Sequence, residues 1–202
     1  MTKILVLFAH PMLEKSRVQH ALVSTARTTA NVTVHDLYEE YPDFDVDVRR
    51  EQALLIQHDI VVLQHPFYWY SCPALMKQWI DLVLEHGWAY GRHGKALQGK
   101  KMVNVISLGG SDDAYKGSGL NRHTVREFLI PFEQTATLCR MEYLPPYVVH
   151  GTHKATEEDI RRHADAYALL LERLGAGRIS QNDLHSSRYL NDILSTVSGG
   201  KG

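Results

Sequence analysis

Apolar and polar positions divide the chain into short apolar runs and longer segments with helical periodicity. The first run, Lys3–Phe8, is continuous rather than alternating, which is typical of a parallel strand covered on both faces. Within the last run, Pro145-Pro146 indicates an edge, a bulge or the end of the strand. Five strands are predicted in all, over residues 3–8, 31–37, 59–63, 101–108 and 140–150.

Helices are predicted between the strands from apolar spacing and from signals at their ends. Ser16 with Gln19 three residues later has the pattern of a capping box, and Gly87 is the expected stop of the third helix. That third helix has apolar residues at helical spacing at Leu75, Trp79, Leu82 and Val83. Five helices are predicted in all. The first begins at Ser16, the second spans Val48–His58 and the third begins at Pro73. The fourth begins at His123 and is interrupted at Pro131, and the fifth runs from Thr156 to about Leu174.

Strands that alternate with helices predict an α/β fold with a parallel, doubly wound sheet. Five strands fit a flavodoxin-like three-layer sandwich of order 2-1-3-4-5, in which ligands bind beyond the carboxyl ends of the first and third strands. The loops expected at that edge are Ala9–Gln19, His65–Ser71 and Ser107–Tyr115, and their composition is unusual. The sequence therefore predicts a ligand site where these three loops meet.

The domain boundary is placed after residue 174. Residues 1–174 are expected to form the binding domain, and residues 175–202 a C-terminal extension that is partly disordered, above all at Ser198–Gly202. Within the extension, five apolar residues are expected to form a short amphipathic helix against the body or a partner: Leu184, Tyr189, Leu190, Ile193 and Leu194.

Composition excludes several classes of function. The formal net charge of −1 over 202 residues gives no argument for nucleic acid or an acidic membrane surface. Two cysteines suit a reducing compartment, and neither a signal peptide nor a membrane-spanning stretch is evident, so a cytoplasmic protein is expected. The 12 histidines show no metal-ligand spacing, so no metal site is predicted.

Each of the three loops offers a different kind of ligand contact. A helix N-terminus follows His10 and favours a phosphate, with the Ser16 hydroxyl and Arg17 beside it, although Ser16 also serves simply as an N-cap. The rings of Phe67–Tyr70 suit a flat heterocycle, although they also suit a core cap or a dimer interface. Ser107–Gly110 lets backbone approach a ligand closely because two glycines lack side chains.

One phosphate, one flat ring and one backbone-lined edge describe flavin mononucleotide (FMN) better than a dinucleotide such as FAD. Cys72 lies near a predicted helix N-terminus, which would lower its pKa, but a buried, inert thiol is the favoured interpretation.

Several motifs along the chain resemble the NAD(P)H:quinone oxidoreductase family, and in particular the ancillary flavoproteins of glutathione-regulated potassium-efflux systems. The resemblance covers about residues 3–174 and rests on Ala9-His10-Pro11, Leu37-Tyr38, Tyr41-Pro42-Asp43-Phe44, Gln64-His65-Pro66, Tyr70-Ser71, Trp79-Ile80-Asp81 and His86-Gly87. It implies a flavodoxin-like homodimer that binds FMN, with the active site completed across the dimer interface.

The resemblance also assigns roles to residues. It implies phosphate and ribityl contacts from His10, Ser16, Arg17, Val18 and Gln19, and ring contacts from Phe67, Tyr68, Trp69, Tyr70, Ser107, Leu108, Gly109 and Gly110. The catalytic candidates are Tyr115, near the hydride path, and His123, close to the place where the family has a histidine, which Asn121 occupies here.

The activity that the resemblance implies is two-electron, ping-pong hydride transfer from NAD(P)H through the flavin to a quinone or another electrophile. The alternative belongs to another class of protein: a regulatory subunit of a glutathione-gated potassium-efflux transporter at the inner face of the cell membrane, with the flavin as a structural or sensing ligand.

Overall fold

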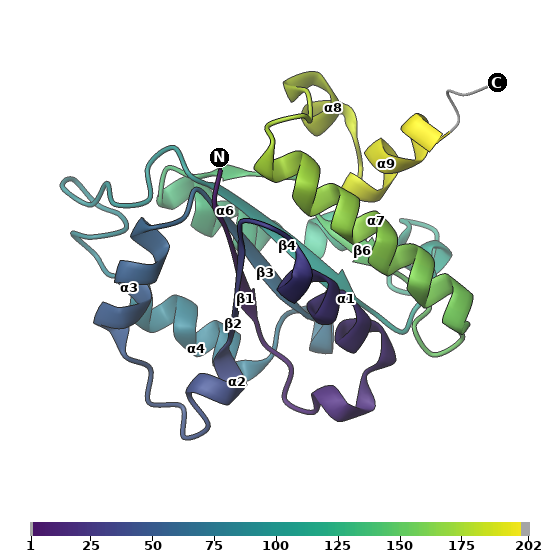
Figure 1. Ribbon diagram of the computed structural model, residues 1–202, viewed down its shortest axis with the longest axis horizontal. Helices are drawn as coiled ribbons and strands as arrows, with labels where there is room; N and C mark the ends of the chain where they lie inside the picture. The colour runs from purple at the N-terminus through teal and green to yellow at the C-terminus, as the bar shows by residue number, and fades with distance from the viewer. Residues whose placement is uncertain (1, 199–202) are drawn as a thin grey trace.

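The computed structural model describes residues 2–198 and contains one parallel sheet in the order β2-β1-β3-β4-β5, with β6 also paired to β4 (Figure 1). The strands are β1 (Ile4–Phe8), β2 (Val32–Asp36), β3 (Ile60–Pro66), β4 (Lys101–Ser107), β5 (Glu142–Tyr143) and β6 (Tyr147–Val149). The expected class and strand order are confirmed. The single last strand predicted over residues 140–150 is instead divided by Pro145-Pro146, because proline cannot donate a backbone hydrogen bond to the ladder.

Helices cover both faces of the sheet, as the alternating pattern predicted (Figure 1). The longer helices are α1 (Arg17–Thr28), α3 (Val48–Ile56), α4 (Ala74–Val83), α6 (Ile130–Leu138), α7 (Glu157–Gly175) and α9 (Leu190–Ser198). Shorter turns are α2 (Leu37–Glu40), α5 (Val125–Phe128), α8 (Gln181–Ser186), η1 (Leu13–Lys15), η2 (Tyr68–Tyr70) and η3 (Asp112–Tyr115). No helix within residues 2–198 is long and apolar enough to cross a membrane.

The two faces of β1 explain why its sequence is continuously apolar. Leu5 and Leu7 belong to a core shared with α3, α4 and α6, whereas Ile4, Val6 and Phe8 belong to a second core under α1, α7 and α9. Because successive side chains of a strand point to opposite faces, a strand buried on both sides needs an apolar residue at every position.

Two element boundaries differ from expectation. β3 continues through Pro66, because Pro66 still pairs in register with Ser107 of β4. α4 ends at Val83 rather than near Gly87: the chain turns at Leu84, which is itself buried, whereas Leu82 is 42% exposed.

The expected helix in the C-terminal extension is present as two helices, α8 and α9. Leu184, Leu190, Ile193 and Leu194 are buried in the core under α1 and α7, and Tyr189 is buried in the core on the other side of the sheet. Gly199–Gly202 lie outside the described residues, and with them most of the stretch for which disorder was expected; Ser198 ends α9.

A buried carboxylate connects β2, α3 and α4. Glu51 is fully buried and accepts hydrogen bonds from the Tyr41 hydroxyl (2.5 Å) and the Trp79 indole N–H (2.7 Å), while His35 Nε2 lies 2.8 Å away. Burial raises the pKa of Glu51, but hydrogen bonds from His35, Tyr41 and Trp79 outweigh burial, so the pKa lies below its ordinary value. The ionised carboxylate is thus the form that the fold stabilises.

Glu51→Gln is expected to lower the free energy of unfolding at neutral pH by about 2–4 kcal/mol, since an amide N–H₂ would face hydrogen-bond donors. The contribution of the carboxylate is fully present above the ordinary pKa of 4.5 and is lost as the pH falls through the lower folded value. Urea unfolding at several pH values should therefore show the difference between the two proteins shrinking towards acid. Exposed Glu172→Gln is the matched control. A difference that does not change with pH would contradict this assignment.

Candidate functional site

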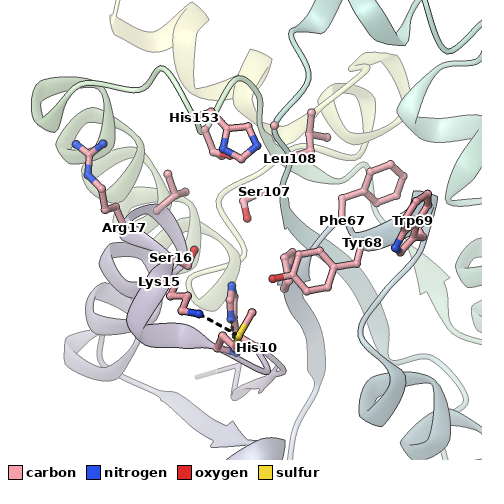
Figure 2. Close-up of a pocket in the computed structure, with 15 residues that line it drawn as sticks. His10, Lys15, Ser16, Arg17, Phe67, Tyr68, Trp69, Ser107, Leu108 and His153 are labelled. Atoms are coloured by element: carbon pink, nitrogen blue, oxygen red, sulfur yellow. Dashed lines mark hydrogen bonds between the residues drawn. The ribbon is translucent and has the colours of Figure 1, made fainter.

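A cavity of about 650 Å³ opens at the carboxyl edge of the sheet, between the loops that follow β1, β3, β4 and β6 (Figure 2). This volume is in the range of small-molecule and cofactor sites. Ten of the predicted site residues line it: His10, Ser16, Arg17, Val18, Phe67, Tyr68, Trp69, Ser107, Leu108 and Gly109. The three loops singled out from the sequence therefore do meet around one cavity.

One end of the cavity is formed by the start of α1. Ser16 is the N-cap, and its hydroxyl accepts a hydrogen bond from the Gln19 backbone N–H at 3.3 Å. The N–H groups of Arg17 and Val18 have no carbonyl partner within the helix, as at every helix start. Together with the positive end of the helix dipole, these groups make this end of the cavity suitable for an anion.

The cation that the sequence placed at this end is engaged elsewhere. The Arg17 guanidinium donates to the Glu157 carboxylate and to the Ala155 carbonyl (3.1 Å), and Figure 2 shows it pointing away from the aromatic loop. Lys15, which sequence analysis did not select, also lines the cavity, and its ammonium donates to the Met12 sulfur at 3.7 Å, without a carboxylate partner among residues 2–198. Lys15 is thus the better-placed positive charge for an anion.

His10 adds a neutral donor. Burial lowers the pKa of its imidazole, although Glu14 acts in the opposite direction. Its Nδ1 accepts the Met12 backbone N–H at 3.1 Å, so the neutral ring carries its hydrogen on Nε2. The ring edge also meets Tyr68, with the ring centres 6.0 Å apart.

A line of buried side chains fixes the orientation of Ser107 in the cavity wall. The Tyr167 hydroxyl donates to Gln64 Oε1 (3.0 Å), and Gln64 Nε2 donates to Gln19 Oε1 (3.0 Å). Gln19 Nε2 in turn donates to Ser107 Oγ (2.9 Å) and to the His65 carbonyl (3.0 Å). Because Ser107 Oγ accepts from Gln19, its own hydroxyl hydrogen is available to a ligand.

This line corrects the expected role of Gln19. Its side chain is fully buried and does not return to the N-cap, so only half of the predicted capping box forms. Gln19 also does not line the cavity; it acts on it through Ser107.

The loop after β3 exposes its rings at the cost of backbone strain. Trp69 is 93% exposed, and Trp69 and Tyr70 have φ values of 49° and 62°, in the left-handed region that side chains other than glycine rarely adopt. Phe67 beside them is buried, and its backbone N–H donates to the Ser107 carbonyl at 2.8 Å. A strained backbone that presents an indole to solvent indicates a functional loop rather than a core cap.

A fourth loop, which sequence analysis missed, completes the wall. Thr152 and His153 follow β6 and line the cavity, as do Met12 and Pro66. A Cβ on Gly109 would lie 2.4 Å from His153 Nε2, so any larger residue here would displace the His153 ring from its present position. The missed signal was positional, because the residues after the last parallel strand reach the same edge as those after the others.

Besides Gln19, four predicted site residues lie outside the cavity: Tyr70, Gly110, Tyr115 and His123. Three of these side chains gather around the Phe128 ring. The centre of that ring lies 4.8 Å from that of Tyr70, 6.2 Å from that of Tyr115 and 5.6 Å from that of His123. Phe67 connects this group to the cavity, since its ring centre is 6.0 Å from that of Tyr115. Gly110 leaves room for the Tyr115 ring, which a Cβ there would approach to 2.8 Å.

Two further groups have pKa values set by burial. Desolvation lowers the pKa of the fully buried His65 to about 4, so its ring is neutral; it stacks on Phe132. Burial raises the pKa of the Cys72 thiol, which favours the inert interpretation of that residue. Among residues 2–198, no three His, Cys, Asp or Glu side chains are grouped to hold a metal ion.

Comparison with known proteins agrees with this geometry. Residues 2–171 match the family model described as a flavodoxin-like fold. The chain is 46% identical over 165 residues to the glutathione-regulated potassium-efflux system ancillary protein KefG of Enterobacter sp. (strain 638), covering 82% of this chain and 90% of the relative.

Two solved structures are also similar. General stress protein 14 of Treponema denticola, solved in complex with FMN, is 42% identical with a TM-score of 0.82, covering 85% of this chain and 99% of the other. An NADPH-quinone reductase from P. pentosaceus is 35% identical with a TM-score of 0.75, covering 84% and 97%.

Trp69→Gly is expected to raise the free energy of unfolding by about 0.5–1 kcal/mol, because glycine adopts a positive φ without strain and the exposed indole contributes little packing. Trp69→Ala, which keeps the strain, should give no such gain. Denaturant unfolding of the three proteins measures the difference. Equal stability of the Gly and Ala variants would show that the backbone is not strained at this position.

Proposed function

We propose that this protein is an FMN-dependent NAD(P)H:quinone oxidoreductase. The chain belongs to the family described as having a flavodoxin-like fold. The observation that carries this proposal is the one cavity bounded by a helix N-terminus with Lys15, by the rings of Tyr68 and Trp69, and by the Ser107–Gly109 backbone. These features match, in turn, a phosphate, a flat heterocycle and a polar ring edge.

The anion end of the cavity supports a mononucleotide. The first turn of α1 supplies free N–H groups, Lys15 a positive charge and His10 a neutral N–H donor. Among the residues that line the cavity, the start of α1 is the one α-helix N-terminus, which suits one phosphate and favours FMN over FAD. Arg17 is expected to contribute less, because its guanidinium already pairs with Glu157.

The opposite end supports a ring. FMN, when bound, supplies the hydride-accepting heterocycle and returns two electrons to the acceptor. Trp69 and Tyr68 offer faces for stacking, the Ser107 hydroxyl is oriented by Gln19 to donate, and Gly109 allows the backbone to approach the ring edge. NAD(P)H and then the quinone would use the same exposed ring face in turn, which is a ping-pong order.

Tyr115 and His123 are the proposed hydrogen-bond donors. They would stabilise the negative charge that develops at the edge of the ring during hydride transfer. Burial first, and Tyr70 second, raise the pKa of the Tyr115 phenol, so it is a neutral donor at physiological pH. Both residues contact Phe128, and Tyr115 also contacts Phe67, which lines the cavity. We further propose that the active form is a homodimer, whose second subunit covers the exposed Trp69 and completes the site.

A second candidate function is favoured by the relatives. Ancillary proteins of potassium-efflux systems are 46% identical to this chain, so the protein is also a candidate subunit of such a transporter. In that role it would lie in the cytoplasm or at the inner face of the membrane, with FMN as a structural or sensing ligand.

Lys15→Ala is expected to weaken FMN binding about fivefold to tenfold, because it removes a charge beside the phosphate. Riboflavin, which lacks the phosphate, should bind the natural protein more weakly and should be insensitive to this substitution. Titration of flavin fluorescence with both ligands measures this, with Arg17→Ala as the matched control and a smaller effect expected. Equal losses for FMN and riboflavin would refute the phosphate assignment.

Gly109→Val separates the two candidate functions. A branched side chain would fill the space between Gly109 and His153, and we expect FMN binding and NAD(P)H–quinone turnover to fall at least about tenfold. The isolated natural protein should catalyse this turnover. If it does not, and if both proteins are retained equally by membranes that contain the transporter, the enzyme assignment is wrong and the subunit assignment stands.

A further inference from the structure

The tail segment, residues 176–198, lies beyond the family match, which ends at residue 171, yet it is bound firmly to the body. The Leu190 N–H donates to the Pro146 carbonyl at 3.0 Å. The Asn191 side-chain amide accepts from the Val148 N–H (2.9 Å) and donates to the Val148 carbonyl (3.0 Å). This amide therefore pairs with the edge strand β6 as a neighbouring strand would, which covers an otherwise open edge.

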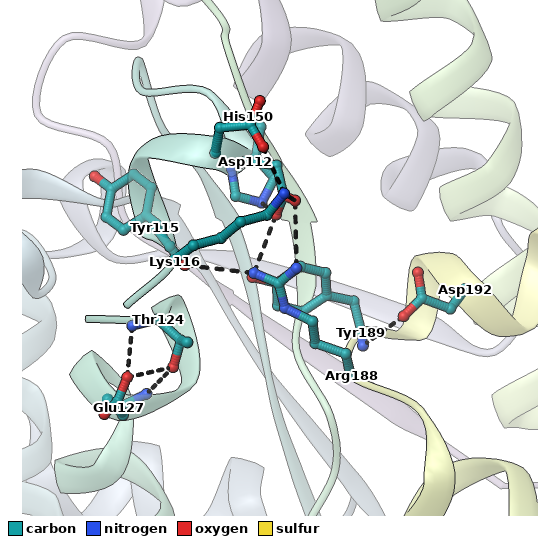
Figure 3. Close-up of polar contacts among 10 residues, drawn as sticks. Asp112, Tyr115, Lys116, Thr124, Glu127, His150, Arg188, Tyr189 and Asp192 are labelled. Atoms are coloured by element: carbon teal, nitrogen blue, oxygen red, sulfur yellow. Dashed lines mark hydrogen bonds and ion pairs between the residues drawn. The ribbon is translucent and has the colours of Figure 1, made fainter. Parts of the chain in front are cut away.

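Arg188 projects from this anchored segment, between α8 and α9, towards the loop after β4 (Figure 3). Its Nη1 donates to Asp112 Oδ2 at 3.3 Å, and its Nη2 lies 3.1 Å from Asp112 Oδ1 and 3.5 Å from the Tyr115 carbonyl. The guanidinium also lies over the Tyr189 ring, 4.5 Å from its centre. One planar group thus holds both the first and the last residue of η3.

Other charges near Asp112 cannot replace this contact. Lys116 Nζ is 3.7 Å from Asp112 Oδ2, but it belongs to the same loop and cannot fasten the loop to the body. His150 Nε2 is 3.4 Å from Asp112 Oδ1, but burial lowers the pKa of this imidazole, although Asp112 raises it. Three basic residues lie beside Asp112 in the described structure: Lys116, His150 and Arg188. Of these, Arg188 alone both comes from outside the loop and carries a permanent charge.

The loop held by Arg188 is continuous with the wall of the cavity. Leu108 and Gly109 line the cavity, Gly110 follows them, and η3 brings the Tyr115 ring against Phe67, another wall residue. A displacement of η3 would therefore move the Tyr115 ring and with it the support of Phe67. The Gly109 backbone is held separately, because Leu108 N–H donates to the Val149 carbonyl (2.9 Å) and Gly151 N–H donates to the Gly110 carbonyl (2.9 Å). The anion end, formed by Lys15 and the start of α1, is on other elements and would stay in place.

We propose that Arg188 is a positioning residue: it connects the tail segment to η3 and thereby sets the position of Tyr115, and through it of Phe67, against the ring of the bound cofactor. This inference rests on the proposed function, because it assigns the tail segment a role in the geometry of hydride transfer. It predicts that the segment affects the rate of reduction far more than the binding of the cofactor.

The first test needs no cofactor. In Arg188→Ala, amide hydrogen exchange in residues 111–121 of the cofactor-free protein should become about fivefold faster, since the loop loses its fastening to the body. Arg178→Ala removes an exposed arginine from the same segment and should leave this exchange unchanged. Unchanged exchange in Arg188→Ala would overturn the proposal, whether or not the protein binds FMN.

The second test uses the FMN-loaded protein. Arg188→Ala should slow reduction by saturating NADPH roughly fivefold, because small displacements of reacting groups are costly, while the FMN dissociation constant changes by less than about threefold. Arg188→Lys should recover part of the rate. Asp112→Asn should reproduce the loss, and the double variant should be no slower than either single variant.

The outcomes are distinguishable from failure of the function itself. If the natural protein binds no FMN, the proposed function fails, and the exchange test still decides whether Arg188 holds the loop. If the natural protein turns over and Arg188→Ala reacts at the natural rate, the positioning role is wrong. A parallel loss of FMN affinity and thermal stability would also overturn it, in favour of a general structural role.

Discussion

In-register parallel pairing of the central strands is the constraint on which the site depends. Phe8 of β1 pairs with Gln64 of β3, and Ser107 of β4 pairs with Pro66 of β3 on one side and with Val149 of β6 on the other. Because parallel strands run in the same direction, these pairings bring all four following loops to one edge. A slip by one residue would turn every wall residue to the other face of the sheet.

The line of side chains from Tyr167 to Ser107 keeps this edge in place from within. It crosses from α7 through β3 and α1 to β4, and each amide in it is satisfied by its neighbours. A buried polar group without a hydrogen-bond partner raises the free energy of the folded state. This line of hydrogen bonds therefore favours one arrangement of its side chains, which fixes the distances between α7, β3, α1 and β4. Rigidity below the cavity contrasts with strain above it, where Trp69 and Tyr70 hold positive φ values. A firm floor and an exposed aromatic rim suit the binding of a planar cofactor whose face must stay accessible to a second reactant.

Much of this architecture could be predicted from the sequence, because the signals were local. The continuous apolar run at Lys3–Phe8 and the helix starts at Ser16 and Thr156 depend on neighbours within a few residues, and the structure confirms them. Side-chain partners were harder to predict. Gln19 looked like a capping residue, but a buried network across three other elements determines where its amide points.

The partners of charged side chains also depend on tertiary contacts. Arg17 and Lys15 are two residues apart in the sequence. Only the packing of α1 against the start of α7 shows that Arg17 forms an ion pair with Glu157, whereas Lys15 lines the cavity without such a pair in the described structure. His153 and Arg188 reach the site through contacts between distant parts of the chain, which a single sequence does not reveal. The fold and the three loops were thus predictable, whereas the orientation of the side chains around the cavity required the tertiary structure.

The most direct test of the account is the visible spectrum of the purified protein with FMN under nitrogen, before and after NADPH and then a quinone. The account predicts flavin absorbance that remains with the protein on gel filtration, bleaches with NADPH and returns when the quinone is added. A protein that stays colourless after exposure to FMN would contradict it, and the cavity would then be a binding surface for some other partner.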